Sequence, residues 1–355
     1  MGNHRILIIG PSWVGDMVMA QSLFIALKNN HPDADIDVLA PAWSRPILER
    51  MPEVRSSIDM PIGHGQLLLQ ERRELGQSLK GQYDQAIVLP NSLKSALIPY
   101  FANIPVRTGW RGEMRYLLLN DIRKLDKDYY PLMVERFVAL AHPKGSILER
   151  PLPNPALKVD LEQAQQLRQR FELNSERPVL ALCPGAEFGP AKRWPEEHYA
   201  AVAREKIDQG WQVWLLGSAK DEAVAEAIKE HMQPDEQAHC HILAGATELA
   251  EAIDLLSLAD AVISNDSGLM HIAAALQKPL VVVYGSTSPK FTPPLSEQVA
   301  IVQLEVDCGP CFQRECPEGH LKCLKFLLPS QVLEALEQVL DMTQPAIVEQ
   351  GEGVR

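Results

Sequence analysis

The feature that most constrains the fold is an alternation of short β-branched runs and longer amphipathic stretches, which occurs twice along the 355 residues. Such alternation is typical of βα units, which build a parallel sheet with helices on its faces. Between the two series lie Pro151, Pro153 and Pro155, and proline is excluded from helix interiors. The sequence therefore predicts an α/β protein with two Rossmann-like halves joined by a linker.

The predicted elements follow this division. Strands are expected at 5–10, 35–40, 54–60, 83–90 and 106–109, and again at 178–183, 212–217, 261–264 and 280–284. Helices are expected at 16–30, 43–51, 65–80, 91–101 and 131–141, and again at 161–171, 195–209, 221–232, 247–258, 267–276 and 330–342. We place the first domain at residues 1–152, the second at 153–328, and a final helix and frayed tail at 329–355.

Charge and hydropathy exclude several classes of protein. The net charge is −12 and the sequence pI is near 5.4, which disfavours a protein that tracks nucleic-acid phosphates with clustered cations. No stretch of 18 or more apolar residues occurs, since Asp16 and Gln21 interrupt the N-terminal run. The start also lacks the pattern of a signal peptide. We therefore expect a cytosolic setting without a membrane span.

The first loop that leaves a predicted strand and enters a helix is Gly10–Met17. It superficially matches a phosphate-binding loop, but Asp16 and Met17 stand where lysine and serine or threonine would hold phosphate and magnesium. The loop also lacks the GxGxxG pattern of dinucleotide-binding proteins. From the residues alone, Asp16 is either a partner of the helix start or a general base that faces a hydroxyl acceptor.

Two later loops favour an anionic ligand. The loop Cys183–Pro195 carries Lys192 and Arg193, which suit a diphosphate as point charge and two-pronged donor, or which form an ordinary surface pair. The loop Ser264–His271 offers a helix start at which free N–H groups favour an anion. Its candidate residues are the cap residues Asp266 and Ser267, then Gly268, and His271 on the same helix face. Together the two loops favour binding of a nucleoside diphosphate.

Two further groups leave alternatives open. Residues 107–124 carry five cations against two acids, which indicates an anionic partner or arginine stems that cover apolar surface. Their cations are Arg107, Arg111, Arg115, Arg123 and Lys124. Near the C-terminus, four thiols have plausible zinc spacing, or are reduced packing thiols. They are Cys308, Cys311, Cys316 and Cys323.

Taken together, the segments Gly10–Asp16, Cys183–Pro195 and Ser264–His271 resemble glycosyltransferase family 9. Pro90–Ala96 and Thr108–Tyr116 resemble those family members that act on the lipopolysaccharide inner core. The resemblance implies a GT-B fold, in which two Rossmann-like domains with parallel sheets face each other across a cleft. It also implies an enzyme whose N-terminal domain binds the acceptor and whose C-terminal domain binds ADP-heptose.

The resemblance further implies roles for individual residues. Asp16 matches the proposed general base. The implied donor-binding residues are Gly185, Ala186, Lys192, Arg193, Gly217, Glu222, Asp266, Ser267, Gly268 and His271. Lys94, Arg107, Arg111 and Arg115 become candidates for binding the carboxylates and phosphates of the acceptor. No metal or other cofactor is required, because cations and a helix start can stabilise the departing diphosphate.

The implied reaction is inverting transfer of L-glycero-D-manno-heptose from ADP-heptose to the first heptose of heptosyl-Kdo2-lipid A, with release of ADP. An aspartate of ordinary pKa is a weak base for a hydroxyl, so we expect deprotonation late in the reaction. The implied enzyme is a cytoplasmic monomer that contacts the cytoplasmic face of the inner membrane transiently. Alternatives are a heptosyltransferase of the type that adds the first heptose, a nucleotide-sugar epimerase, or a non-catalytic nucleotide-sugar-binding protein.

Overall fold

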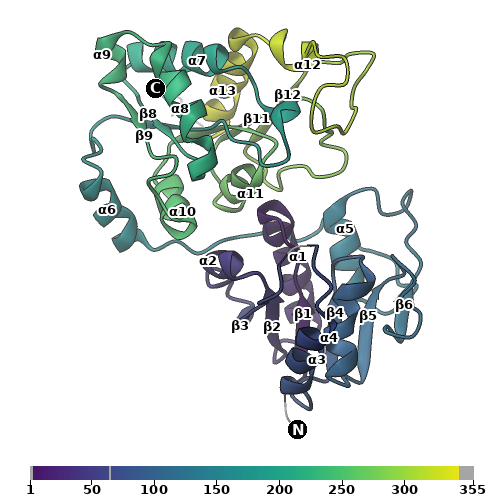
Figure 1. The fold of residues 1–355 in the computed structure, drawn as a ribbon. Coiled ribbons are helices and arrows are strands. Elements are labelled where there is room, and N and C mark those ends of the chain that lie inside the picture. The colour runs from purple at the N-terminus through teal and green to yellow at the C-terminus, as the bar shows by residue number, and fades with distance from the viewer. Residues whose placement is uncertain (1–2, 64, 344–355) are drawn as a thin grey trace, which may run out of the picture.

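The computed structural model describes residues 3–63 and 65–343 and contains two six-stranded parallel sheets, one in each half of the chain (Figure 1). The strand orders are β3-β2-β1-β4-β5-β6 and β12-β11-β10-β7-β8-β9. Both follow the doubly wound Rossmann order, in which the chain starts near the middle of the sheet and later returns to extend the other side. The predicted fold class is therefore confirmed.

The first half begins and ends its elements close to the predicted positions. Its strands are β1 Arg5–Ile9, β2 Asp35–Ala40, β3 Val54–Asp59, β4 Gln85–Val88, β5 Val106–Trp110 and β6 Asp121–Arg123. Its helices are α1 Val14–Asn30, α2 Arg45–Leu48, α3 Leu69–Ser78, α4 Leu97–Phe101 and α5 Met133–Val138, with 3-10 turns η1 Ala42–Ser44, η2 Leu93–Ala96 and η3 Ala139–Ala141.

The second half repeats the pattern. Its strands are β7 Val179–Cys183, β8 Gln212–Leu215, β9 Cys240–Ile242, β10 Ala261–Asn265, β11 Leu280–Tyr284 and β12 Val299–Gln303. Its helices are α6 Leu161–Arg170, α7 Glu196–Asp208, α8 Glu222–Glu230, α9 Pro234–Gln237, α10 Leu249–Ser257, α11 Gly268–Ala275, α12 Lys322–Lys325 and α13 Pro329–Thr343, with 3-10 turns η4 Pro190–Lys192 and η5 Ala219–Asp221. The tail expected after residue 343 lies outside the described residues.

The central strands read as apolar runs because helices cover both faces of each sheet. Every residue of β7, β10 and β11 is buried, which is typical of parallel strands packed on both sides. The three strands that the sequence pattern did not predict, β6, β9 and β12, all lie at sheet edges. Edge strands are short or half-exposed, so they lack a continuous apolar signal.

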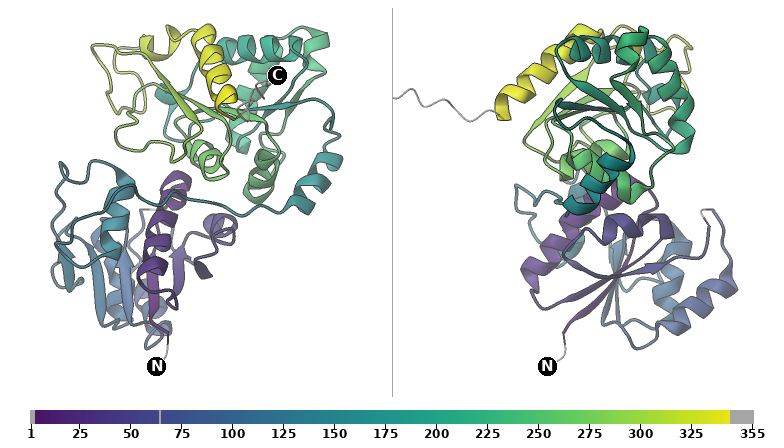
Figure 2. Two further views of the ribbon diagram at one scale, coloured as in Figure 1. Left: turned by 180° about the vertical axis from the view of Figure 1, so that it is seen from behind. Right: turned by 90° about the vertical axis from the view of Figure 1, so that its left-hand side faces the viewer.

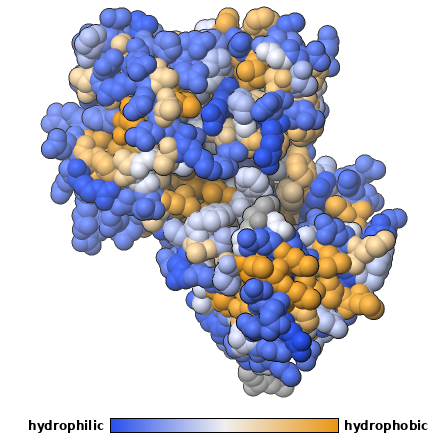
Figure 3. Space-filling model, viewed as in Figure 1, coloured by the Kyte–Doolittle hydropathy of each residue, from blue (hydrophilic) through white to orange (hydrophobic). Residues whose placement is uncertain are grey.

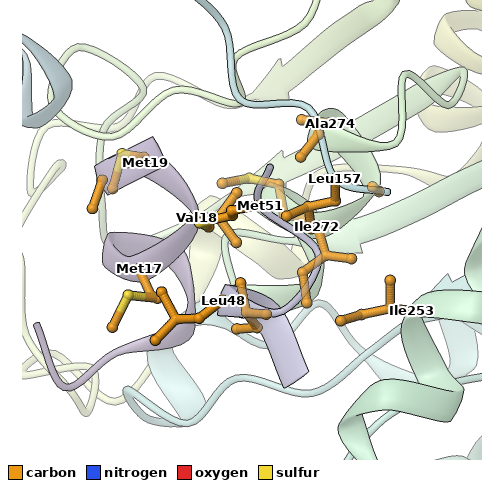
Figure 4. Packing of buried hydrophobic residues seen from close by; sticks show 14 of the residues in the cluster. Met17, Val18, Met19, Leu48, Met51, Leu157, Ile253, Ile272 and Ala274 are labelled. Atoms are coloured by element: carbon orange, nitrogen blue, oxygen red, sulfur yellow. The ribbon is translucent and has the colours of Figure 1, made fainter. Parts of the chain in front are cut away.

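The two halves meet through helices that follow the central strands. In Figure 1, α1 and α2 of the first half lie against α11 and α10 of the second, and residue contacts support both pairs. The contact is apolar: in Figure 4, Val18 of α1 and Met51 lie beside Leu157 and Ile272 of α11, and all four belong to one buried cluster. Figure 2 shows the two halves as separate bodies in both further views, with α13 (yellow) packed on the second half. Within the described chain, no helix is long and apolar enough to cross a membrane.

Candidate active site

The three predicted ligand loops all follow strands at the point in each sheet where the order of strand addition reverses. The loop before α1 follows β1, which lies next to β4, and the other two loops follow β7 and β10, which are also neighbours. In open α/β sheets, ligands bind at this topological switch point, outside the carboxyl ends of the strands. The structure therefore brings the three loops to the junction of the two halves.

Close contacts between α1 and α11 join the two halves at these loops. A Cβ atom built on Gly15 would lie 2.5 Å from Cδ2 of His271, and one on Gly268 would lie 2.7 Å from Cβ of Val14. Each glycine therefore admits a side chain from the opposite half of the molecule. The starts of α1 and α11 therefore approach so closely that the positions of Gly15 and Gly268 have no room for a side chain.

Asp16 lies in the first turn of α1 and is partly buried. Among residues 3–63 and 65–343, no hydrogen-bond partner of its side chain is found, and Trp13, which precedes α1, makes no capping hydrogen bond with its side chain. Burial raises the pKa of Asp16 to about 6, and the positive charge of Lys192 in the other half partly offsets this effect. The carboxylate is therefore a stronger base than the ordinary aspartate expected from the sequence.

Lys192 lies opposite Asp16 in an ion pair with Asp266. The distance from Lys192 Nζ to Asp266 Oδ2 is 2.5 Å, and the two side chains are only 13% and 5% exposed. Thr287 donates a hydrogen bond of 2.6 Å to the same carboxylate oxygen. Asp266, which follows β10, thus fixes the position of Lys192, which lies in the loop after β7. This ion pair joins the two loops at the switch point.

Arg193 points to a second acid at the end of β8. Its Nη2 lies 3.9 Å from Oδ1 of Asp221, and its buried Nε has no hydrogen-bond partner among the described residues. Gly185 and Gly217 both allow Asp221 to approach, since Cβ atoms built on them would lie 2.5 Å and 2.8 Å from its side chain. Glu222 follows directly as the first residue of α8, so these donor-site candidates form one group.

His271 occupies the junction as a buried and uncharged side chain. Its ring is 6% exposed, and burial lowers the pKa of His271 to about 4, although Asp266 acts in the opposite direction. At neutral pH the imidazole is therefore neutral. Its ring fills the space next to Gly15 and packs between the two halves.

The four acceptor candidates fall into two groups. Arg111 follows β5 at the carboxyl edge of the sheet and is exposed, and Lys94 in η2 follows β4 at the same edge and is partly exposed. Arg107 lies instead at the start of β5, where its guanidinium donates to the carbonyls of Leu118 and Ile104. The structure therefore separates Arg107 from the edge that carries Asp16.

Arg115 is fully buried, so it faces no ligand in this structure. Its guanidinium donates 2.7 Å and 3.3 Å hydrogen bonds to the carbonyl of Pro90 and the hydroxyl of Ser95, and another to the carbonyl of Trp110. Burial lowers the pKa of Arg115 to about 10. Arg115 ties together the loops after β4 and β5, in place of the acceptor contact expected from the sequence.

The sequence patterns missed three polar residues of the site: Asp221, Thr287 and Arg314. Asp221 accepts hydrogen bonds from the backbone and hydroxyl of Ser218, a capping pattern that is readable as Ser-x-x-Asp. Arg314 reaches the ring of Phe188 from a distant segment, and Lys192 lies over the same ring. No sequence signal locates Arg314, because a non-local contact brings it to the site.

Comparison with known proteins gives a consistent family. Residues 72–322 match the model of glycosyltransferase family 9 (heptosyltransferase). The chain is 53% identical over 342 residues to lipopolysaccharide heptosyltransferase 2 of Salmonella typhimurium, covering 95% of this chain and 98% of the relative. It is 51% identical over 344 residues to lipooligosaccharide heptosyltransferase 2 of Haemophilus influenzae, covering 95% and 99%.

A solved structure has the same arrangement of both halves. The structure of E. coli ADP-heptose lps heptosyltransferase II superposes with a TM-score of 0.87 at 50% sequence identity, and the match covers 95% of this chain and 99% of that one. A match of this extent includes both sheets and the junction between them. The relative orientation of the two halves is therefore shared with that protein.

Proposed function

Because the chain belongs to glycosyltransferase family 9, we propose that it transfers a heptose from ADP-heptose to the lipopolysaccharide inner core. The proposed acceptor position is the first heptose of heptosyl-Kdo2-lipid A, and the proposed sugar is L-glycero-D-manno-heptose. Identity at more than half of the aligned residues to proteins named heptosyltransferase 2 supports this assignment. The observation that carries it is the opposition of Asp16 and Lys192 across the junction.

Asp16 is proposed as the general base. An acceptor hydroxyl oxygen forms the new bond to the anomeric carbon, the bond from that carbon to the diphosphate oxygen breaks, and the hydroxyl proton passes to Asp16. Attack from the face opposite the leaving group inverts the anomeric centre. A catalytic base works best when its pKa lies near the working pH, so the pKa of about 6 supports this role.

Departure of ADP requires positive charge on the other side of the sugar. Lys192 and Arg193 provide it, and the free N–H groups at the start of α11, next to Ser267 and Gly268, favour the same anion. Preorganised donors of this kind stabilise charge that develops in the transition state. No resident metal or cofactor is proposed for this step, and Gly185, Ala186, Gly217 and Glu222 are proposed to border the nucleotide.

The acceptor is proposed to bind the first half, residues 1–152, and the donor to bind residues 153–328. Of the four acceptor candidates, Arg111 and Lys94 are the two that lie accessible at the carboxyl edge of the first sheet. Figure 3 shows apolar side chains on the surface of this half. The most exposed large apolar side chains of residues 1–152 are Leu67, Leu69, Met114, Tyr116, Leu117 and Ile147, which supports transient contact of a cytoplasmic monomer with the membrane that holds a lipid acceptor.

The decisive experiment measures ADP release from ADP-heptose with and without mono-heptosylated Kdo2-lipid A, while mass spectrometry follows the acceptor in the same tube. We expect release that depends on the acceptor, together with a gain of one heptose. Consumption of the donor without acceptor would indicate a hydrolase or an epimerase. A gain on an acceptor that carries only Kdo would indicate transfer of the first heptose, and binding of ADP without turnover would indicate a non-catalytic protein.

A further inference from the structure

Four cysteines far from Asp16 surround a single small cavity in the second half. Cys308, Cys311, Cys316 and Cys323 line about 20 Å³ of space, which is room for one water molecule or one ion. They belong to the segment between β12 and the end of α12, and all are free thiols. The function proposed above gives no role to any of them.

The backbone around Cys316 is arranged to hold a thiolate. The amide of Leu321 donates to Cys316 Sγ over 3.5 Å, and Gly319, with φ +67°, gives the chain between the two residues its tight turn. Thiolates that accept backbone N–H bonds in a tight turn are suited to binding a metal.

The other thiols lie within electrostatic reach of one another. Cys308, Cys311 and Cys323 line the same small cavity as Cys316. Thiolates crowded around one cavity repel each other, and a divalent cation among them converts this repulsion into attraction. The grouping of four thiols therefore favours a cation as the occupant of the cavity.

The wall of the cavity contains a further polar group without a partner. Ser286 lines the cavity and is 2% exposed, and no hydrogen-bond partner of its hydroxyl occurs in the described part of the chain. A buried hydroxyl without a partner is costly. A metal-bound thiolate in the cavity would accept its hydrogen bond, as groups around metal ligands commonly do.

We propose that Cys308, Cys311, Cys316 and Cys323 bind one divalent transition metal, Zn²⁺ or Fe²⁺, through four thiolate ligands. Both metals accept a tetrahedral set of four sulfurs. Binding forms four metal–sulfur bonds and releases the proton of each bound thiol, without oxidation or reduction. Within residues 3–63 and 65–343, no three potential ligands already converge as a metal site, so the cysteine side chains turn into the cavity as the metal enters beside exposed Cys308.

The metal would support the donor loop from behind, an effect that rests on the function proposed above. The amide of Phe312 donates to the carbonyl of Ser286, the amide of Ser286 donates to the carbonyl of Ala191, and the amide of Ala191 donates to the carbonyl of Arg314. This chain of hydrogen bonds joins the cysteine segment to the residue before Lys192. It also fixes the backbone of Arg314, whose guanidinium lies 5.5 Å from the centre of the Phe188 ring.

The test is the metal content of the full chain, purified under reducing conditions and analysed for zinc and iron. We expect about one equivalent of one of these metals per chain, and the ratio of zinc to iron identifies which. Addition of Co²⁺ to metal-depleted protein should give the absorption of thiolate-to-cobalt charge transfer. Metal-depleted protein that binds neither Zn²⁺, Fe²⁺ nor Co²⁺ would overturn the proposal.

Variants then identify the ligands. Cys308→Ser and Cys316→Ser should lose the bound metal, whereas Cys240→Ala, which changes a buried cysteine of β9 away from the cavity, should retain it. His320→Ala should also retain it, and loss of metal in this variant with retention in Cys308→Ser would refute the four-thiolate set. Because metal content is measured without substrate, this result is independent of whether the chain transfers heptose.

Calorimetric titration with ADP tests the effect on the donor loop. Removal of the metal from the wild-type chain should weaken ADP binding, and its return should restore the affinity. Equal ADP affinity with and without bound metal would refute the link to the donor loop. Unimpaired metal binding in a chain that does not bind ADP would instead contradict the proposed function.

Discussion

Asp16, in the first turn of the helix that follows β1, and Asp266, directly after β10, both lie at the switch point of their sheet, but their surroundings differ. Asp266 is buried with two partners, Lys192 at 2.5 Å and Thr287 at 2.6 Å. Asp16 is partly buried without a hydrogen-bond partner in the described chain, and its pKa is raised to about 6. The same residue type is thus a fixed anchor in one half and, in the proposed mechanism, a proton acceptor in the other.

The comparison shows that the surroundings of an aspartate determine whether it serves to anchor a cation or to accept a proton. A carboxylate that pairs with a cation and accepts a hydrogen bond from a hydroxyl is satisfied inside the protein, so removing its charge leaves a buried cation unpaired. A carboxylate that is desolvated without a partner gains basicity but destabilises the folded protein when it is charged. Substitution by asparagine should therefore have opposite effects on stability at the two sites.

The largest expected effect is on the rate after Asp16→Asn. Asparagine keeps the shape but accepts no proton, so kcat should fall by about 10²- to 10⁴-fold, the usual contribution of general base catalysis. ADP affinity, measured by calorimetry, should remain within a few-fold of the wild type. Asp33→Asn, an exposed acid of the same half, is the matched control, and an unchanged kcat in Asp16→Asn would remove Asp16 from the mechanism.

The second effect is on stability after Asp266→Asn. This change leaves Lys192 charged and largely buried without its counter-ion, which should lower the free energy of unfolding by about 3 kcal/mol. Urea denaturation followed by circular dichroism measures it. The control is Asp59→Asn, which breaks an exposed pair with Arg45 and should change stability by less than about 1 kcal/mol. Equal effects in the two variants would contradict the anchoring role.

The third effect is a gain in stability from Asp16→Asn, with a defined pH dependence. The pKa of Asp16 in the folded protein, about 6, lies above its ordinary value of 3.8. Protonation of Asp16 therefore stabilises the folded state, and this contribution is complete when the pH is below the ordinary pKa. This contribution is lost as the pH rises through 6. At neutral pH the charged carboxylate costs at most about 3 kcal/mol, which Asp16→Asn should recover.

Urea denaturation of the wild type and Asp16→Asn, at acid and at neutral pH, checks this expectation. The two proteins should differ most at neutral pH and should converge below pH 4, where Asp16 is protonated in both the folded and the unfolded state. A variant that is less stable than the wild type at neutral pH would show that the charged form of Asp16 is satisfied in the folded protein.

The smallest effect is expected for Gly15→Ala. Alanine favours a helix more than glycine by about 1 kcal/mol, but its Cβ would lie 2.5 Å from Cδ2 of buried His271. The clash should give a net loss of about 1–2 kcal/mol. His271→Ala should relieve it, so the double variant measures the coupling between the halves. Additive effects of the two changes would show that the contact is too soft to matter.

The sequence was sufficient to predict most of the fold because the signals were local. Ranges such as Asp35–Ala40 and Leu280–Tyr284 agree with observed strands, since alternating or continuous apolar residues define them. By contrast, β6 consists of Asp121, Ile122 and Arg123. A run of three residues with two charges gives no periodic signal, and only its pairing with β5 makes it a strand.

The site was less predictable because several of its properties depend on the other half of the chain. The loop of Asp16 was visible as a strand-to-helix connection, but its raised pKa arises from burial at the junction. Arg111 and Arg115 lie four residues apart in one basic segment, yet one is exposed and the other has no exposed surface. Charge counts along the sequence do not distinguish these two situations.

The paired contacts of Gly15 with His271 and of Val14 with Gly268 affect how such proteins can be recombined. Two sheets of equal topology suggest that halves from different family members could be exchanged freely in chimaeric enzymes. Each half, however, contributes one glycine and one larger side chain to a matched set. We expect chimaeras to fold with the native packing only when the incoming half keeps its glycine and its larger side chain at the junction. Because these residues must match those of the retained half, the two halves can change only together.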